Sequence, residues 1–363
     1  MQIVVDQLAA ELAERGNRVI VACPDYGDLD GPRPTYGYQV ERCFGLTLPT
    51  AAMGVSAWRR LLGRERFDIV HAHNVWPGGT LGLMARRFGA KVVVTSHGRD
   101  ILTEPSIGYG SRLNPFLAAI TRWTLGRVDA HTVVSASMVG PARAAGSDPD
   151  NIFVVPNFLT ASAPEKKNDR ERQVAPGGAA GSEKTDEPYL LMVGRLHPVK
   201  GIDLALAAFS EARREFPAFR LKIVGGGSEG DRLRVLAGEL GLGDSVDWLG
   251  PVTGEQKDEL TKRAAAVLVT SRVEAFCLAA LEAMALGIPV IVPDRPPFTD
   301  IIGARSGLFI DPGQPRTLKA ALKRLEEPGV AAEIGGRARE AAAAFTRSAA
   351  VDAYEEVYHR LIG

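Results

Sequence analysis

Short apolar runs alternate along this chain with longer amphipathic stretches. The runs are rich in Val, Ile and Leu and mostly end at Gly, Ser, His or Pro. The stretches between them repeat their apolar residues with the 3.6-residue period of a helix. Such alternation predicts strand–helix units arranged around a parallel sheet. The pattern fills the first half of the chain and starts again at Tyr189, so we expect an α/β protein with two Rossmann-like domains.

The strands predicted by this pattern fall into two sets. In the first half they are Arg18–Cys23, Asp68–Ala72, Lys91–Thr95, Ala130–Val134 and Ile152–Val155. In the second half they are Tyr189–Val193, Arg220–Val224, Ser245–Leu249, Ala266–Thr270 and Pro289–Val292. Helices of the second half are expected to start at Gly201, Glu229 and Glu255 and to span Phe276–Leu286.

A stretch of different composition separates the two sets. Residues 159–187 are polar or small and lack periodicity, so we expect a disordered linker there. The first domain is then 1–158 and the second 188–340, and a last helix lies within 341–363. One face of this helix carries the apolar side chains of Val351, Tyr354, Val357, Tyr358 and Leu361. A stripe of this kind needs a partner to cover it.

Composition and charge exclude several classes of protein. The 363 residues include 43 basic and 43 acidic side chains, and the net charge of zero removes the field expected of a nucleic-acid-binding protein. The three cysteines lack metal-site spacing and suit a reducing compartment. No apolar stretch approaches the roughly 18 residues of a membrane span, and the start lacks the pattern of a signal peptide. We therefore expect a cytoplasmic protein, neither secreted nor integral.

Two cations follow the first strand of the second domain. Gly194, Arg195, Lys200 and Gly201 lie between this strand and the next helix. In open α/β sheets the carboxyl ends of the strands form the ligand side, and helix N-termini there favour anions. Either cation alone would be read as a solvated side chain in a turn. Together they predict a phosphate site.

Two carboxylates frame the start of a later helix. Glu274 precedes this helix and Glu282 lies within it, in apolar surroundings that predict a buried carboxylate with a partner. If Phe276, Cys277 and Leu278 open the helix, their free backbone N–H groups can bind phosphate oxygens. The carboxylates can accept hydrogen bonds from sugar hydroxyls.

The combination Gly-Arg-x4-Lys-Gly followed by Glu-x7-Glu resembles the retaining glycosyltransferases of family four, which have the GT-B fold. The resemblance covers nearly the whole chain. Further fragments that carry it are Phe67–His73, Thr95–Gly98, Val155–Asn157, Thr270–Glu274 and Ala283–Val290. It implies two Rossmann-like domains and a C-terminal helix that crosses back to the first.

The resemblance also implies roles for single residues. Arg195 and Lys200 would bind the donor diphosphate, Glu274 the transferred sugar, Glu282 the ribose, and His97 the donor sugar and phosphate. The donor is a nucleotide-diphosphate sugar, and the acceptor is a glycan, a lipid-linked molecule or a small molecule. No cofactor and no metal is expected, and retention would follow from front-face attack.

Two rival readings stay open. Gly225, Gly227 and Gly230, with Asp247 downstream, have the spacing of a dinucleotide fingerprint and favour a nicotinamide-dependent oxidoreductase. These glycines lie at the second strand–helix turn rather than the first, and can equally line a nucleotide site. A non-catalytic or decayed nucleotide-sugar binder is the other rival. Cys277 supports it, because the family commonly has glycine there.

Two further segments bear on partners and on the histidines. Trp58–Arg66 forms a basic amphipathic helix that either rests on an anionic membrane or buries Leu61 and Leu62 in the core. His71 and His73 end a strand near the ligand side. We expect at most one of them to reach the site, because neighbouring strand residues alternate between faces.

The start of the chain departs from the family pattern. Met1–Arg15 reads as a helix, and no strand precedes it. Relatives begin with a central strand and a Gly-rich loop, so we expect this chain to start inside their first helix. A gap in the strand pairing of the first domain should result, along with poor sugar transfer.

Overall fold

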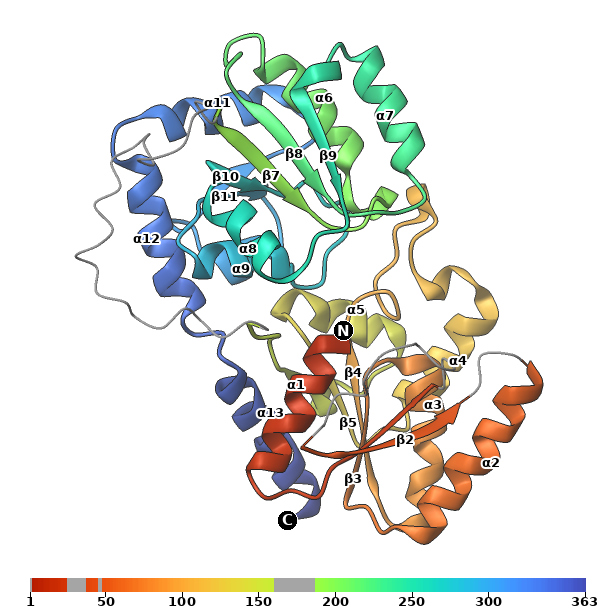
Figure 1. The fold of residues 1–363 in the computed structure, drawn as a ribbon. Helices are drawn as coiled ribbons and strands as arrows, with labels where there is room; N and C mark the ends of the chain where they lie inside the picture. Colours follow the sequence, from red (N-terminus) through yellow and green to blue (C-terminus); the bar gives the residue numbers. More distant parts are fainter. Residues whose placement is uncertain (1, 25–36, 45–47, 160–186) are drawn as a thin grey trace. The chain divides into compact units, whose positions relative to one another are not determined.

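The computed structural model describes residues 2–24, 37–44, 48–159 and 187–363 (Figure 1). The chain divides into two compact units, of which the first comprises 1–160 together with 345–363 and the second 161–344. Most of the predicted linker, 160–186, lies outside the described residues. Each unit is an α/β structure with parallel strands, as the sequence predicts.

The second unit is built on a six-stranded sheet. Its strands are β7 (Tyr189–Val193), β8 (Arg220–Val224), β9 (Val246–Gly250), β10 (Ala266–Leu268), β11 (Val290–Pro293) and β12 (Leu308–Ile310). The order is β12-β11-β10-β7-β8-β9, with parallel pairs throughout. The chain starts at β7, runs outward to β9 and returns to the other side of β7 at β10. This reversal makes β7 and β10 the switch point, where such sheets bind ligands.

Helices cover this sheet on both faces. They are α6 (Ile202–Ala212), α7 (Gly230–Glu239), α8 (Gly254–Lys262), α9 (Leu278–Ala285), α10 (Phe298–Ile302), α11 (Pro315–Glu326) and α12 (Val330–Ala342). α6 packs on α11, and α9 packs on α12. Fully buried side chains such as Leu190, Phe209 and Leu221 form the core between sheet and helices. The predicted strands of this unit are confirmed. The three-residue β12 was not predicted.

The strands of the first unit form two sheets. They are β1 (Ile20–Pro24), β2 (Gln39–Phe44), β3 (Ile69–Ala72), β4 (Lys91–Ser96), β5 (Ala130–Val133) and β6 (Ile152–Val154). β1 pairs with β2, and the other four pair in the order β3-β4-β5-β6. Within the described residues no pairing joins β1 to β3, so the predicted gap in strand pairing is confirmed. The strand β2 was not predicted.

The C-terminal helix belongs to the first unit. α13 (Arg347–Ile362) packs on α1 (Gln2–Glu14), as Figure 1 shows. Arg15, directly after α1, binds Asp352 and Glu355 at 2.5 and 2.8 Å, and Arg347 binds Glu11 of α1 at 2.5 Å. Of the apolar stripe of α13, Val351, Tyr354 and Val357 are buried and Tyr358 and Leu361 are half-buried. The prediction that this helix packs back on the first domain is therefore confirmed.

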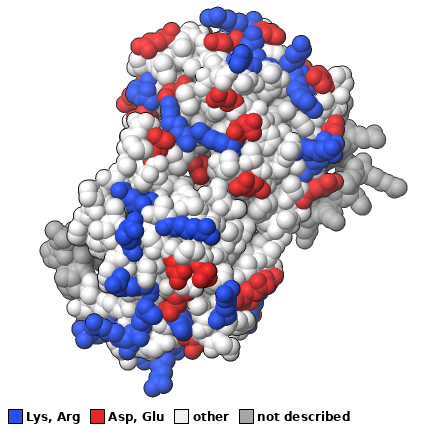
Figure 2. All heavy atoms as spheres, turned by 180° about the vertical axis from the view of Figure 1, so that it is seen from behind, with Lys and Arg blue, Asp and Glu red and all other residues white. Residues whose placement is uncertain are grey.

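The helix α2 (Leu48–Arg64) uses its apolar face inside the first unit. Leu61 and Leu62 are buried, and Trp58 donates a hydrogen bond to the Leu81 carbonyl at 3.1 Å. The reading in which Leu61 and Leu62 pack in the core is therefore confirmed. No helix in the described ranges is long and apolar enough to span a bilayer. Basic and acidic side chains are mixed on the face shown in Figure 2.

Candidate functional site

Two loops meet at the switch point of the six-stranded sheet. One follows β7 and carries Gly194 to Gly201, and the other follows β10 and carries Thr270 to Glu274. Gly201 has a φ of +61°, and a Cβ there would lie 2.1 Å from the Thr270 carbonyl oxygen. The Thr270 hydroxyl donates back to the Gly201 carbonyl at 2.8 Å. Only glycine permits this approach, which brings the predicted cations and carboxylate together.

Lys200 and Glu274 form an ion pair across the two loops. Lys200 Nζ lies 2.7 Å from Glu274 Oε2, with the two side chains 27% and 16% exposed. Burial lowers the pKa of Lys200, and the Glu274 carboxylate raises it by a larger amount. The pKa of Lys200 therefore lies above its ordinary value. The lysine therefore carries its charge at neutral pH. Arg195 is exposed and forms no ion pair with any described residue.

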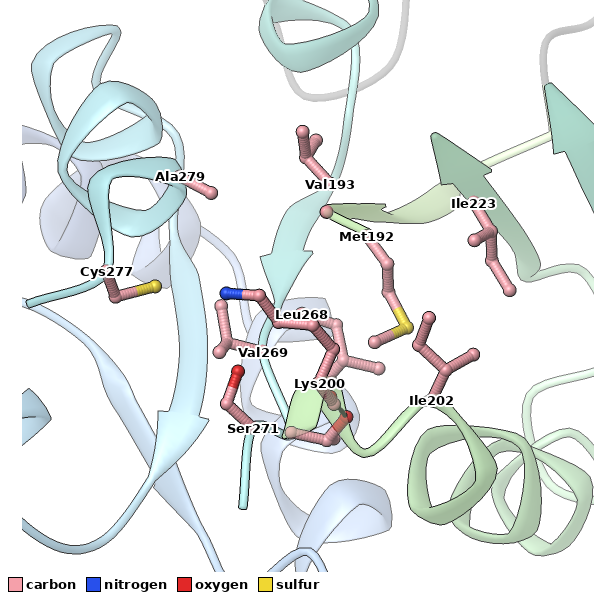
Figure 3. A pocket seen from close by; sticks show the side chains of 12 residues that line it. Met192, Val193, Lys200, Ile202, Ile223, Leu268, Val269, Ser271, Cys277 and Ala279 are labelled. Atoms are coloured by element: carbon pink, nitrogen blue, oxygen red, sulfur yellow. Dashed lines mark hydrogen bonds between the residues drawn. The ribbon is translucent and has the colours of Figure 1, made fainter. Parts of the chain in front are cut away.

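A small cavity lies beside this pair (Figure 3). Its volume is about 20 Å³, which is room for about one water molecule. Gly194, Lys200, Ser271 and Cys277 are among the residues that line it. The Ser271 hydroxyl is buried and has no hydrogen-bond partner among the described residues. Buried polar atoms are rarely left unpaired, so the Ser271 hydroxyl is free to bond an oxygen of a water molecule or a ligand in this cavity. The sequence signalled it only as a neighbour of Glu274.

The helix α9 starts later than predicted. Its first residue is Leu278, while Cys277 is the N-cap and Phe276 is buried in the preceding loop. The free N–H groups therefore belong to the residues from Leu278 onward, and not to Phe276. Cys277 has a φ of +76°, a conformation that favours glycine and that breaks the helix at this point. Burial raises the pKa of its thiol to about 12, so the thiol stays protonated.

This backbone conformation gives a testable order of stabilities at position 277. Both Cys277→Gly and Cys277→Ala remove the thiol, but only alanine keeps a Cβ at positive φ. We expect the glycine variant to be more stable by about 1 kcal/mol in urea unfolding. Cys43 in β2 provides the control, because there alanine should exceed glycine by roughly 0.5–1 kcal/mol. Equal stability of the two variants at 277 would contradict the assigned conformation.

Glu282 has the partner that the sequence demanded. Lys257 of α8 lies 2.9 Å from Glu282 Oε2. The Glu282 side chain is 21% exposed, so the predicted burial of this carboxylate is partial. Both glutamates of the Glu-x7-Glu pattern are thus neutralised by lysines. Lys257 was not predicted as this partner, because the sequence of the polar helix α8 does not distinguish it from Lys262 of the same helix.

The glycines after β8 allow the loop that follows β8 to approach the loop that follows β7. A Cβ at Gly225 would lie 1.8 Å from the Gly194 carbonyl oxygen, and one at Gly227 would lie 2.3 Å from that of Leu196. The Leu196 N–H donates to the Gly226 carbonyl at 2.9 Å. These glycines therefore let the loop pack against the Gly194–Arg195 turn.

Asp247 is held away from the ligand side of the sheet. Its carboxylate binds Arg220 at 2.6 and 3.1 Å. Arg220 is the first residue of β8, so the pair lies toward the amino ends of the strands. A ribose-binding acid of a dinucleotide fold belongs at the carboxyl ends. The spacing that suggested a nicotinamide cofactor is therefore misleading.

The first unit gathers three histidines at the ends of β3 and β4. His73 Nδ1 lies 3.2 Å from His97 Nε2, and the His71 and His73 rings are 4.3 Å apart. The alternation of faces does not separate His71 from His73 as expected, and the expectation that at most one of them reaches the site stays a prediction. These residues are two apart, so they share a face of the strand. Burial lowers the pKa of His71 to about 3 and that of His97 to about 4, which keeps both neutral.

Family models match both halves of the chain. Residues 1–162 match the model described as Glycosyltransferase Family 4, and residues 179–342 match that described as Glycosyl transferases group 1. The D-inositol 3-phosphate glycosyltransferase 2 of Catenulispora acidiphila is 31% identical over 317 residues, which cover 82% of this chain and 71% of that protein. The D-inositol 3-phosphate glycosyltransferase of Acidothermus cellulolyticus is 30% identical over 74% of this chain.

The chain spans only part of some relatives. It covers 61% of the Acidothermus protein and 19% of an exopolysaccharide phosphotransferase of Streptomyces coelicolor that is 34% identical over the matched part. Among solved structures, the sucrose-phosphate synthase of Thermosynechococcus elongatus has a TM-score of 0.79 at 24% identity, covering 99% of this chain and 92% of that one. Anabaena HepE in complex with UDP and glucose has a TM-score of 0.76 at 18% identity, covering 99% and 95%.

Fold and sequence together define a glycosyltransferase of the GT-B class. Within that class the chain belongs to glycosyltransferase family 4, the family that the two motifs resemble.

Proposed function

We propose that the second unit binds a nucleotide-diphosphate sugar at the switch point of its sheet. The observation that carries this proposal is the charged group around Lys200. The ion-paired Lys200 and the unpaired buried hydroxyl of Ser271 line a cavity with Cys277 at the start of α9, and the exposed Arg195 follows Gly194 of the same lining. Arg195 and Lys200 would bind the diphosphate, with the first N–H groups of α9 adding partial positive charge.

The carboxylates would then bind the sugars at either end of the diphosphate. The Glu274 carboxylate, which is paired with Lys200, would also accept hydrogen bonds from hydroxyls of the transferred sugar. Glu282, held by Lys257, accepts hydrogen bonds from the ribose. By the family resemblance alone, the neutral imidazole of His97 would contact the donor sugar and phosphate. These roles follow the family resemblance, and the ion pairs of Glu274 and Glu282 support them.

The reaction we propose is transfer with retention, without a metal. The glycosidic bond to the diphosphate breaks, and an oxocarbenium-like centre and a departing anion develop together. Fixed cations stabilise that anion without having to reorganise. The acceptor hydroxyl attacks from the face that the leaving group vacates and gives its proton to a departing phosphate oxygen. No carboxylate is assigned as a nucleophile, and an NMR assignment of the product's anomeric configuration tests retention.

For the acceptor we propose a hydroxyl on a small phosphorylated polyol. Relatives with 28–31% identity carry the name D-inositol 3-phosphate glycosyltransferase, so this phosphate is the first acceptor to assay. Glycan and lipid-linked acceptors form the second panel. The nicotinamide-dependent alternative is not favoured, because Asp247 is bound to Arg220 at the other end of the sheet.

A ligand panel tests the donor assignment. We expect UDP, GDP or ADP to raise the melting temperature, since a ligand at ~100 times its dissociation constant adds about 2.7 kcal/mol. NADH should have no effect, and Lys200→Ala should abolish the shift. Stabilisation by NADH alone would overturn the proposal. Nucleotide binding without transfer to any acceptor would instead indicate a non-catalytic binder.

A further inference from the structure

The helix α13 inserts two tyrosines into the polar interior of the first unit. The Tyr358 hydroxyl lies 2.7 Å from His71 Nδ1. The Tyr354 hydroxyl lies 3.4 Å from Thr95 Oγ1, and Tyr354 is only 2% exposed. Tyr358 and His71 are 287 positions apart in the sequence. Apolar packing does not require either hydroxyl group, since phenylalanine at these two positions would bury the same ring.

One assignment of donors and acceptors satisfies every member of this hydrogen-bond chain. In it the Thr132 hydroxyl donates to the Val94 carbonyl at 3.4 Å and accepts from Thr95, which lies 2.5 Å away. Thr95 then accepts from His71 Nε2 at 2.6 Å. A neutral His71 that donates at Nε2 accepts at Nδ1, and Tyr358 is the donor there. The reverse tautomer of His71 would instead donate to Tyr358, and both tautomers keep the ring bonded at each nitrogen.

His71 is thereby held at both ring nitrogens and becomes a fixed support. The His73 ring packs on it at a centroid distance of 4.3 Å, with the planes 32° apart. His73 in turn bonds to His97 at 3.2 Å, with the two rings stacked. Within the described residues, the remaining nitrogens of His73 and His97 have no protein partner. Whichever of the two donates in their shared bond decides whether His97 offers a substrate an N–H or a lone pair.

We propose that Tyr358 is a positioning residue for His97, acting through His71 and His73. The proposal rests on the role assigned above to His97 in binding the donor. Tyr358 touches no substrate. Its hydroxyl fixes the orientation of His71, and the stacked rings pass that orientation to the imidazole that meets the donor.

Tyr358→Phe tests this, because it keeps the ring and removes one hydroxyl. We expect kcat to fall on the order of tenfold, as small misplacements of a reacting group do, with little change in KM for the nucleotide sugar. Long-range ¹H–¹⁵N spectra of the six histidines should show altered signals for His71 and for His97. Tyr189→Phe is the matched control. Its hydroxyl donates to the Leu260 carbonyl at the same 2.7 Å in the second unit, so it should lose similar stability and leave the histidine signals unchanged.

The outcomes separate this proposal from a structural role. If Tyr358→Phe lowers the unfolding free energy as Tyr189→Phe does but leaves the His97 signals and kcat unchanged, Tyr358 only stabilises the fold and the proposal fails. If Tyr358→Phe does not fold, Thr95→Val and Thr95→Ser replace it. Valine should shift the His97 signals and serine should restore them, and an unchanged spectrum in both overturns the proposal. Full turnover by His97→Ala would overturn the function proposed for His97, whatever the spectra show.

Discussion

Lys200→Ala should lower turnover on the order of a hundredfold or more, as the loss of one donor to a developing anion typically does. The charge removed is the one paired with Glu274 at 2.7 Å, beside the start of α9. Steady-state kinetics with the nucleotide sugar that the ligand panel identifies would measure the loss. Lys319→Ala is the matched control, because Lys319 forms an ion pair of the same length with Glu215 on the surface. That variant should keep full turnover.

Arg195→Ala should lower turnover to a similar extent with a smaller effect on folding. Its guanidinium is exposed and, in the described part of the chain, has no ion-pair partner to leave behind. Surface changes of this kind usually alter stability by less than about 0.5 kcal/mol. Lys200→Ala, in contrast, strands the partly buried carboxylate of Glu274 and should cost some stability. Full turnover in either variant would end the assignment of the diphosphate site.

Mild acid should unfold the first unit before the second. Burial lowers the pKa of His71 to about 3 and the pKa values of His97 and His131 to about 4, against an ordinary 6.5. The unfolded chain therefore binds more protons than the folded one as the pH falls below 6.5, so stability present above that pH is lost toward pH 4. At pH 5 the loss is roughly 2 kcal/mol for each of these histidines. The second unit contains a single histidine, His197.

Hydrogen exchange followed by mass spectrometry would check this, since it reports each unit separately. Peptides of β3 to β6 should lose protection near pH 5 while those of β7 to β11 keep it. His131→Gln is the matched variant. His131 bonds to the hydroxyls of Ser96 and Ser147 at 2.8 and 2.6 Å, and an amide there takes up no proton. Between pH 7 and pH 5 it should lose roughly 2 kcal/mol less than the parent. Loss of protection in the second unit first would refute the prediction.

The local pattern of apolar and polar residues was enough to predict most strands and helices and part of the candidate site. Strand and helix type follow from the period of apolar residues, and the carboxyl ends of parallel strands locate a ligand side before any coordinates exist. Arg195, Lys200 and Glu274 were predicted because each lies in a loop between a strand of the second unit and the next helix. The strands β2 and β12 were missed, and β2 lacks the regular alternation of apolar and polar residues that predicts a strand.

Only the tertiary structure showed which side chains of distant segments contact each other. A spacing of glycines and an acid suggested a dinucleotide site, yet Gly225 packs on Gly194 and Asp247 binds Arg220. A basic amphipathic pattern fitted a membrane helix, yet Leu62 fills the core.

By itself the sequence determined the two α/β units, the family and the charged residues at the strand ends, because those depend on periods and spacings within a few residues. Only the folded chain determined that Lys257 neutralises Glu282, that Ser271 is left without a partner, and that Tyr358 reaches His71. Hydrogen bonds and ion pairs form between atoms within about 3 Å of each other, and a one-dimensional pattern carries no information about which distant residues come that close.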